Sequence, residues 1–238
     1  MKKASIGALL WLIVLSLGVG VVIEAARESA RIKSQRGVEV LVAGVWHPVQ
    51  RDMESGAIFV PQGATLRTSS NSAADVILFD SKSSLRLMPG TVLAFKETTL
   101  EELQTEEAVS TTRLELLGGA VVGVQSKLTR LSAFDFVLPS GVVHIVGTEY
   151  YVSTSGAVSV ISGTVTVRFN LPGNGGSVVV TVAAGQSFDP ATGKVVSTTP
   201  EFVQSIQADV ETARNNAQVF KAGGATIVVK PELSPVHP

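Results

Sequence analysis

Apolar and polar residues alternate with a period of two from Gly37 to about residue 190. The alternating runs are short, as in "VEVLVAGVWHPV", "ADVILF" and "SLRLM", and turn residues such as Pro89 and Gly90 separate them. Successive runs start about 8–12 residues apart, which leaves no room for crossover helices. The pattern predicts a mainly β domain over residues 37–190, built of stacked antiparallel hairpins as a β-roll, a sandwich or a solenoid-like stack.

Within this domain, the run "VGTEYYVSTSGAVSVISGTVTV" over residues 146–167 predicts two strands joined by a turn at Ser155 and Gly156. Strict alternation along the first strand sorts its side chains onto two faces. One face holds Val143, Ile145, Gly147, Glu149 and Tyr151, and the other holds Val142, His144, Val146, Thr148, Tyr150 and Val152. Residues 96–113, with five glutamates, interrupt the alternation and predict a solvated, mobile excursion between strands.

The period changes again near residue 198. Thr199 is suited to cap a helix and Pro200 to begin it. A single apolar stripe follows at spacings of three and four, and it comprises Phe202, Ile206, Val210, Ala213, Ala217 and Phe220. We expect one C-terminal amphipathic helix over residues 198–222, packed on the β domain or joined to a partner helix, and then a short strand and tail over residues 223–238.

The N-terminus reads as a membrane segment. Residues 4–23 contain no charge, and about 20 apolar residues suffice to cross a bilayer as a helix. We expect residues 1–26 to be an uncleaved anchor, or a signal peptide if cleaved, and residues 27–36 to be a linker. Arg27, Arg31, Lys33 and Arg36 follow the segment, so the positive-inside tendency opposes export of the following domain. We nevertheless expect that domain to be exported.

Composition and charge narrow the chemistry further. The formal net charge is −1 and charged residues make up 16% of the chain, so no basic field is available to bind nucleic acid. The chain has no cysteine, which excludes disulfides and thiolate metal sites. Its three histidines, His47, His144 and His237, lie far apart, and no nucleophile, phosphate-loop or metal motif is present. Aspartates such as Asp75, Asp135 and Asp189 fall at turns or strand ends.

We therefore expect no catalytic residue, metal site or cofactor, and the chain is not expected to be an enzyme. Aromatic and apolar side chains remain as a candidate interaction surface. Trp46 with Tyr150 is a possible sugar-stacking platform, and Phe202 and Ile206 lie on the helix stripe.

The order of the segments resembles the FecR domain family, named after the iron-dicitrate sensor protein of bacterial cell-surface signalling. The matching pieces run from Gly37 to Phe188 and include "VPQGATLRTSSNSAADVILFDSKSSLRLMPGTVLAF", "LELLGGAVVGVQ", "FDFVLPSGVVHIVGTEYYVS", "VSVISGTVTV" and "VTVAAGQSF". The resemblance implies an envelope β domain that binds or senses without catalysis. The turn-forming or fold-defining positions that it singles out are Gly63, Thr68, Asp80, Gly147, Thr148, Gly163, Gly185 and Gln186.

Members of the family that signal carry a cytoplasmic N-terminal domain that holds a sigma factor. Here only Met1, Lys2 and Lys3 precede the apolar segment, which disfavours direct anti-sigma regulation. The expected function is protein binding or sensing in envelope signalling, by a protein of the bacterial inner membrane whose β domain lies in the periplasm. If the N-terminus is cleaved, the protein is secreted to the periplasm. The alternative is a structural or glycan-binding envelope module.

Overall fold

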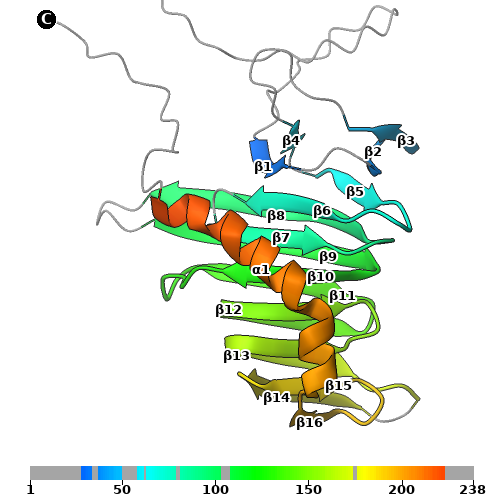
Figure 1. Cartoon of the computed structure of the whole chain (residues 1–238), viewed down its shortest axis with the longest axis vertical. Coiled ribbons are helices and arrows are strands. Elements are labelled where there is room, and N and C mark those ends of the chain that lie inside the picture. Colours follow the sequence, from blue (N-terminus) through cyan, green and yellow to red (C-terminus); the bar gives the residue numbers. More distant parts are fainter. Residues whose placement is uncertain are drawn as a thin grey trace, which may run out of the picture.

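The computed structural model describes residues 28–33, 37–49, 58–61, 63–78, 81–102, 108–173 and 176–222. Within these residues, sixteen strands and one helix are formed, and Figure 1 shows the strands stacked with the helix across them. Their bounds are β1 Glu28–Ile32, β2 Val38–Val42, β3 Val45–Pro48, β4 Ile58–Pro61, β5 Thr65–Thr68, β6 Ala74–Leu78, β7 Ser83–Leu87, β8 Val92–Glu102, β9 Ala108–Gly118, β10 Ala120–Gln125, β11 Ala133–Leu138, β12 Gly141–Ser153, β13 Val158–Asn170, β14 Ser177–Ala183, β15 Gln186–Asp189, β16 Lys194–Ser197 and α1 Pro200–Ala222.

The strands form one curled sheet that folds into two half-sheets. The first, which we call the open half-sheet, runs β3-β2-β5-β8-β9-β11-β12-β13-β14. The second, the helix-covered half-sheet, runs β4-β1-β6-β7-β10-β12-β13-β15-β16. Both contain β12 and β13, because β11 pairs with the first part of β12 and β10 with its second part. β14 and β15 divide β13 in the same way.

The two half-sheets face each other across one core. A single buried cluster takes inward side chains from both, such as Phe95 and Phe136 from the open half-sheet and Leu85 and Phe188 from the helix-covered one. Two aromatic pairs bridge them edge to face, with ring centroids 5.9 Å apart for Phe136 and Tyr150 and 5.3 Å apart for Phe169 and Phe188. The predicted mainly β fold with one C-terminal helix is confirmed, but the sheet is not built of antiparallel hairpins alone, because β9 and β11 pair in parallel.

A pair of β-bulges marks where β12 and β13 pass between the half-sheets. The register jumps from Val146 opposite Thr164 to Glu149 opposite Ser162, and then to Tyr150 opposite Val160. The first jump adds a residue to β12 and the second adds one to β13, so the original register is restored. The turn between these strands lies at residues 154–157, as the sequence predicted.

Strict alternation along β12 was a wrong prediction, because the bulge reverses which side chains point inward. Val143 and Ile145 are buried before the bulge, and Thr148, Tyr150 and Val152 are buried after it. A period of two assumes one residue per pleat, and the extra residue of a bulge shifts that count by one.

Two other segments also differ from expectation. The predicted linker 27–36 contributes strand β1, which pairs with β4 and β6 and buries Ala30 and Ile32. The predicted acidic excursion 96–113 is largely strand, because β8 and β9 extend into it as a paired hairpin. Inward positions there are hydroxyl residues, Thr98, Ser110 and Thr112, all buried. The glutamates therefore obscured a strand pattern whose inward residues are small and polar rather than apolar.

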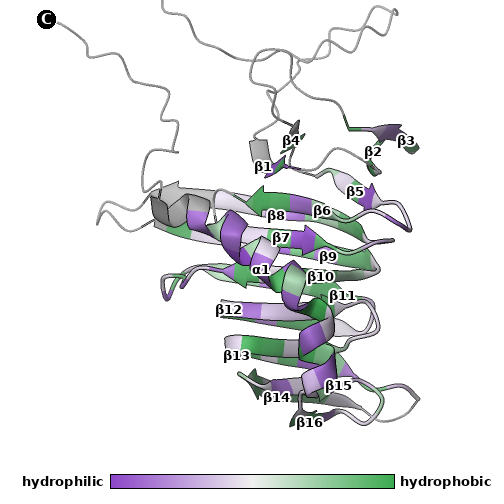
Figure 2. Ribbon diagram, in the orientation of Figure 1, coloured by the Kyte–Doolittle hydropathy of each residue, from purple (hydrophilic) through white to green (hydrophobic). Residues whose placement is uncertain are grey.

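Helix α1 begins and packs as the sequence predicted. The backbone N–H of Phe202 donates to Thr199 Oγ1 at 3.3 Å, which caps the first turn. The apolar stripe faces β6, β7 and β10, where Ile206, Val210 and Ala213 form a second buried cluster with Val122. Figure 2 shows both hydrophilic and hydrophobic residues along α1, as expected of an amphipathic helix. Phe220 and the strand and tail predicted over 223–238 lie outside the described side chains.

Within the described part of the chain, no helix combines the length and apolar character that a membrane span requires. The segment 4–23, which the sequence predicted to cross a membrane, lies outside those residues.

Candidate functional site

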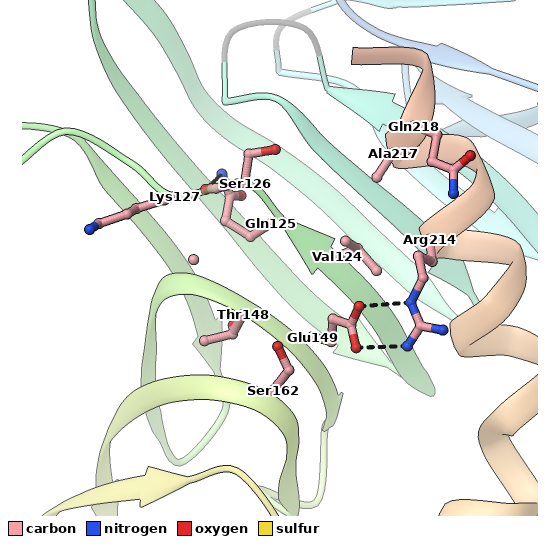
Figure 3. Close-up of a pocket in the computed structure, with 11 residues that line it drawn as sticks. Val124, Gln125, Ser126, Lys127, Thr148, Glu149, Ser162, Arg214, Ala217 and Gln218 are labelled. Carbon is pink, nitrogen blue, oxygen red and sulfur yellow. Dashed lines mark hydrogen bonds and ion pairs between the residues drawn. The ribbon is translucent and has the colours of Figure 1, made fainter. Parts of the chain in front are cut away.

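A partly open hollow beside the double bulge lies between β12 and the C-terminal half of α1. Its volume is about 360 Å³, and Figure 3 shows the side chains that surround it. The lining residues are Val124, Gln125, Ser126, Lys127, Gly147, Thr148, Glu149, Ser162, Arg214, Ala217 and Gln218. We call this hollow the helix groove.

The bulge shapes one wall of the helix groove through two glycines. Gly147 and Gly163 have φ angles of +62° and +82°, a region that L side chains rarely adopt. A Cβ on Gly163 would lie 2.7 Å from the carbonyl oxygen of Gly147, and one on Gly147 would lie 2.9 Å from Lys127 Cα. Glycine is therefore required on both strands for the backbones to come this close. The bulge in turn points Thr148 inward and leaves Glu149 on the side of the helix.

A bidentate ion pair crosses the helix groove. Arg214 Nε and Nη2 each donate to a carboxylate oxygen of Glu149 at 2.9 Å, as drawn in Figure 3. The hydrogen bond to Glu149 raises the pKa of Arg214 above its usual value. Lys127 is exposed at the rim, so the groove has two cations and one carboxylate among amides and hydroxyls. This set of donors and acceptors can bind a polar group.

Further polar links hold α1 along its length. Arg86 on β7 donates to Asp209 of the helix at 2.5 Å and to both carboxylate oxygens of Asp75 at 2.9 and 3.1 Å. Lys33 Nζ donates to Asn216 Oδ1 at 2.7 Å. The helix is therefore fixed to the helix-covered half-sheet by both apolar and ionic contacts.

The outer face of the open half-sheet has a different character. Register places two side-chain rows across β9, β11, β12, β13 and β14, and no described helix packs on them. The first row is Arg113, Asp135, His144, Thr166 and Thr181, and the second is Glu115, Val137, Val142, Arg168 and Val179. We call these ten residues the open face. It combines a valine centre with charged and hydroxyl residues around it.

The residues that the sequence proposed as an interaction surface do not come together. Tyr150 is fully buried, so its proposed surface role is wrong: the bulge turns it inward, where its ring lies over Gly123. Ile206 is buried between α1 and the sheet. Phe202 is partly buried against Tyr151, with ring centroids 5.1 Å apart. Trp46 lies on β3, where Arg67 Cζ is 4.4 Å from its ring centroid.

The predicted turn and fold-defining positions serve local structure where they are described. Gly63 and Gly185 have φ angles of +81° and +76°. Thr68 Oγ1 donates to the carbonyl of Met88 at 2.7 Å and accepts from the N–H of Thr91 at 2.8 Å. Gln186 Oε1 accepts from the N–H of Ala183 at 3.0 Å. Asp80 lies outside the described residues.

Sequence reasoning missed Glu149 and Arg214, which meet across 65 residues, and the pair of His144 and Asp135, whose Nδ1 and Oδ1 lie 2.7 Å apart. Only a cross-strand register reveals the second pair, because Asp135 and His144 sit opposite each other on β11 and β12. Among the described residues, no group of three or more His, Cys, Asp or Glu side chains is placed to hold a metal ion.

No protein-family model matches this chain, and no curated protein matches it in sequence. Two crystal structures of proposed anti-sigma factors from Parabacteroides distasonis ATCC 8503 are similar to it in structure. The sequence identity is 16% in each case, over 60% and 57% of this chain, with TM-scores of 0.46 and 0.43. This chain covers 63% and 59% of those chains.

Proposed function

We propose that this chain is a non-catalytic cell-envelope protein of the FecR type, which binds a protein partner through the open face. The observation that carries the proposal is the contrast between the two outer faces. α1 covers one face with a buried apolar stripe and three polar links, whereas no described element packs on the other.

The chemistry of the open face fits a protein partner. Its middle positions, Val137 and Val142, are partly exposed, and Val179 at the β14 end is 61% exposed. Arg113, Glu115 and Arg168 surround them with both signs of charge. A modest apolar centre with a charged and hydrogen-bonding rim is the usual composition of a non-obligate protein interface. The ordered sequence pieces from Gly37 to Phe188 add the resemblance to a domain family with a binding role.

The glycan-binding alternative has less support from the geometry. Sugar recognition commonly uses an exposed aromatic ring as a stacking surface, and Tyr150 is buried in the core. The outward side chains of the open face include no aromatic ring other than the imidazole of His144. We expect no retention of the chain on purified envelope polysaccharide, and retention that is lost on Trp46→Ala would favour the glycan-binding module instead.

Site-specific photo-crosslinking tests the proposed interface. A photoreactive residue replaces Thr166 at the middle of the open face, and a control replaces Gln204, which is exposed on α1. The full chain is crosslinked in its native membrane, and we expect one protein to be captured from position 166, and not from 204, and to be lost on Arg168→Glu. Equal capture from both positions would contradict the proposal. Capture of a sigma factor would restore direct anti-sigma regulation.

The membrane placement is proposed from sequence, with residues 4–23 as an anchor and the β domain on the periplasmic side. Because the chain has no cysteine, a single Ser155→Cys in the exposed turn between β12 and β13 is a unique label. Labelling of intact spheroplasts by a membrane-impermeant maleimide is expected. Labelling only after lysis would place the domain in the cytoplasm, as the four cations at positions 27–36 favour.

A further inference from the structure

Four strands in the described part of the sheet have a neighbour on one side only: β3, β4, β14 and β16. Three of them carry a residue that discourages pairing with another chain. β3 and β4 end in Pro48 and Pro61, and β16 begins with Lys194. β14, Ser177–Ala183, has neither a proline nor a charge over its seven residues. It is also the longest of the four, so it is the edge most open to strand addition.

The side chains of β14 already have their places in the fold. Val178 and Val180 pack partly buried against the core, and Val182 is fully buried. Val179 and Thr181 point to the open face and are exposed. Among the described residues, no strand pairs with the outer side of the β14 backbone, where Gln186 Oε1 accepts from the N–H of Ala183. An added strand would therefore bring hydrogen bonds without rearranging side chains.

We propose that β14 pairs antiparallel with β14 of a second copy of this chain, about a two-fold axis at Val180. In this register Val180 faces Val180, Val179 faces Thr181 and Val178 faces Val182. A valine on the inner side meets a valine at every position, so the hydrophobic core continues from one copy into the other. On the outer side, the open face of one copy continues into that of its neighbour.

The choice of a second copy follows from charge and symmetry. The inward residues Val178, Val180 and Val182 select a strand whose inward residues are also apolar, because a charge at those positions would be buried without a counter-charge. The second copy supplies such a strand at equal concentration. A two-fold contact also closes on itself, so it uses up both free edges and does not propagate into a fibre.

Single cysteines test the register directly, because the chain has none of its own. The full chain in detergent is oxidised with Val180→Cys, where the two Cα atoms would lie about 4.5–5.5 Å apart, within disulfide reach. We expect a disulfide-linked dimer. Val179→Cys alone is expected to crosslink far less, because its nearest copy is diagonal at about 7–8 Å. Val179→Cys with Thr181→Cys in one chain should crosslink again.

Val196→Cys is the matched control, since Val196 is 47% exposed on β16, which Lys194 protects. Absence of a crosslink from Val180→Cys, or equal crosslinking from positions 179, 180 and 196, would overturn the proposal.

A second pair of variants distinguishes loss of dimerisation from loss of folding. We expect Val179→Lys to weaken dimerisation at least tenfold by light scattering, and adding Thr181→Glu to restore it through two cross-strand Lys–Glu pairs. Failure of the double variant to restore the dimer would overturn the register.

Pairing of β14 between two copies is independent of partner binding at the open face. Crosslinking at Val180 reports contact between copies, whereas capture from Thr166 reports a second protein, so either can fail while the other holds.

Discussion

The two half-sheets share a core and two strands, yet they differ in what covers their outer faces. On the helix-covered half-sheet, α1 buries Ile206, Val210 and Ala213 against Val122. On the open half-sheet, the corresponding positions carry threonines, charges and scattered valines that remain exposed or partly exposed. The sequence of each strand therefore determines which side chains point inward. Its outward residues also determine whether another element of the same chain packs on the outer face.

The difference indicates how such a domain divides stability from recognition. A face covered by its own helix contributes to folding and is not available for binding. Substitutions on a face that is mixed in polarity and uncovered cost little stability, so such a face can vary to fit a partner. We expect substitutions on the two sides of the molecule to differ accordingly, and the following predictions test that division from the largest effect to the smallest.

The largest effect is expected at the bulge, where the two half-sheets are joined. Gly163→Ala forces a side chain into positive φ and against the carbonyl oxygen of Gly147 at 2.7 Å. Strain and overpacking together should lower the free energy of unfolding by about 3–4 kcal/mol in urea denaturation. Gly173→Ala is the matched control, because Gly173 also has positive φ but an added Cβ meets nothing within 4 Å. Equal losses for the two variants would show that the close approach at the bulge has no energetic role.

The bulge also shows which structural features local sequence patterns do not predict. Most strands between residues 37 and 190, the turn at 154–157 and the span of α1 could be predicted, because each depends on local alternation or capping, whereas β1 and the paired ends of β8 and β9 could not. The direction of Tyr150 could not, since one extra residue at Gly147 and Thr148 reverses every later position of β12. The sequence does carry glycines at positions 147 and 163, but a glycine alone does not say which strand holds the extra residue.

The next largest effect is expected where α1 packs on the helix-covered half-sheet, in contrast to the exposed side of the same helix. Ile206 is 5% exposed, so Ile206→Ala should lower the free energy of unfolding by about 2–4 kcal/mol. Val203→Ala on the same helix removes a side chain that is 39% exposed, and should change it by less than about 1 kcal/mol. Thermal unfolding of both variants measures the contrast. If Ile206→Ala were as mild as Val203→Ala, α1 would not be part of the folded domain.

The helix groove was less predictable than the helix. Its ion pair joins Glu149, which the alternation placed on the face opposite Tyr150, to Arg214 on the polar side of a distant helix. No spacing in the sequence links residues 65 positions apart. The open face could not be predicted from the sequence either, because its two rows of side chains follow from the register of five strands.

A smaller effect, visible mainly in its pH dependence, is expected inside the core. Burial raises the pKa of Tyr150 well above its usual value of 10, and its hydroxyl has no hydrogen-bond partner among the described residues. The unfolded tyrosine therefore ionises first as pH rises, so its contribution is complete below about pH 10 and is lost above it. Tyr150→Phe should raise the free energy of unfolding at pH 7 by about 1 kcal/mol and reduce the loss above pH 10.

Denaturation at pH 7 and pH 10.5 measures both parts of this expectation. The only other tyrosine, Tyr151, also has a pKa raised by burial, so part of the alkaline loss should remain in the variant. A variant that is less stable than the parent at pH 7 would mean that the Tyr150 hydroxyl is hydrogen-bonded in solution.

The smallest effect is expected at the ion pair that crosses the helix groove. Arg214 and Glu149 have side chains 46% and 17% exposed, so solvent screens their attraction even though the geometry is bidentate. Arg214→Gln should lower the free energy of unfolding by less than about 1 kcal/mol at low salt, and the difference should shrink further in about 1 M NaCl, where the Debye length is near 3 Å. Double substitution with Glu149→Gln isolates the pair from each residue's other contacts. A coupling energy above about 2 kcal/mol that persists in high salt would contradict this expectation. The ion pair would then stabilise the folded domain about as strongly as the buried apolar residues of α1 do.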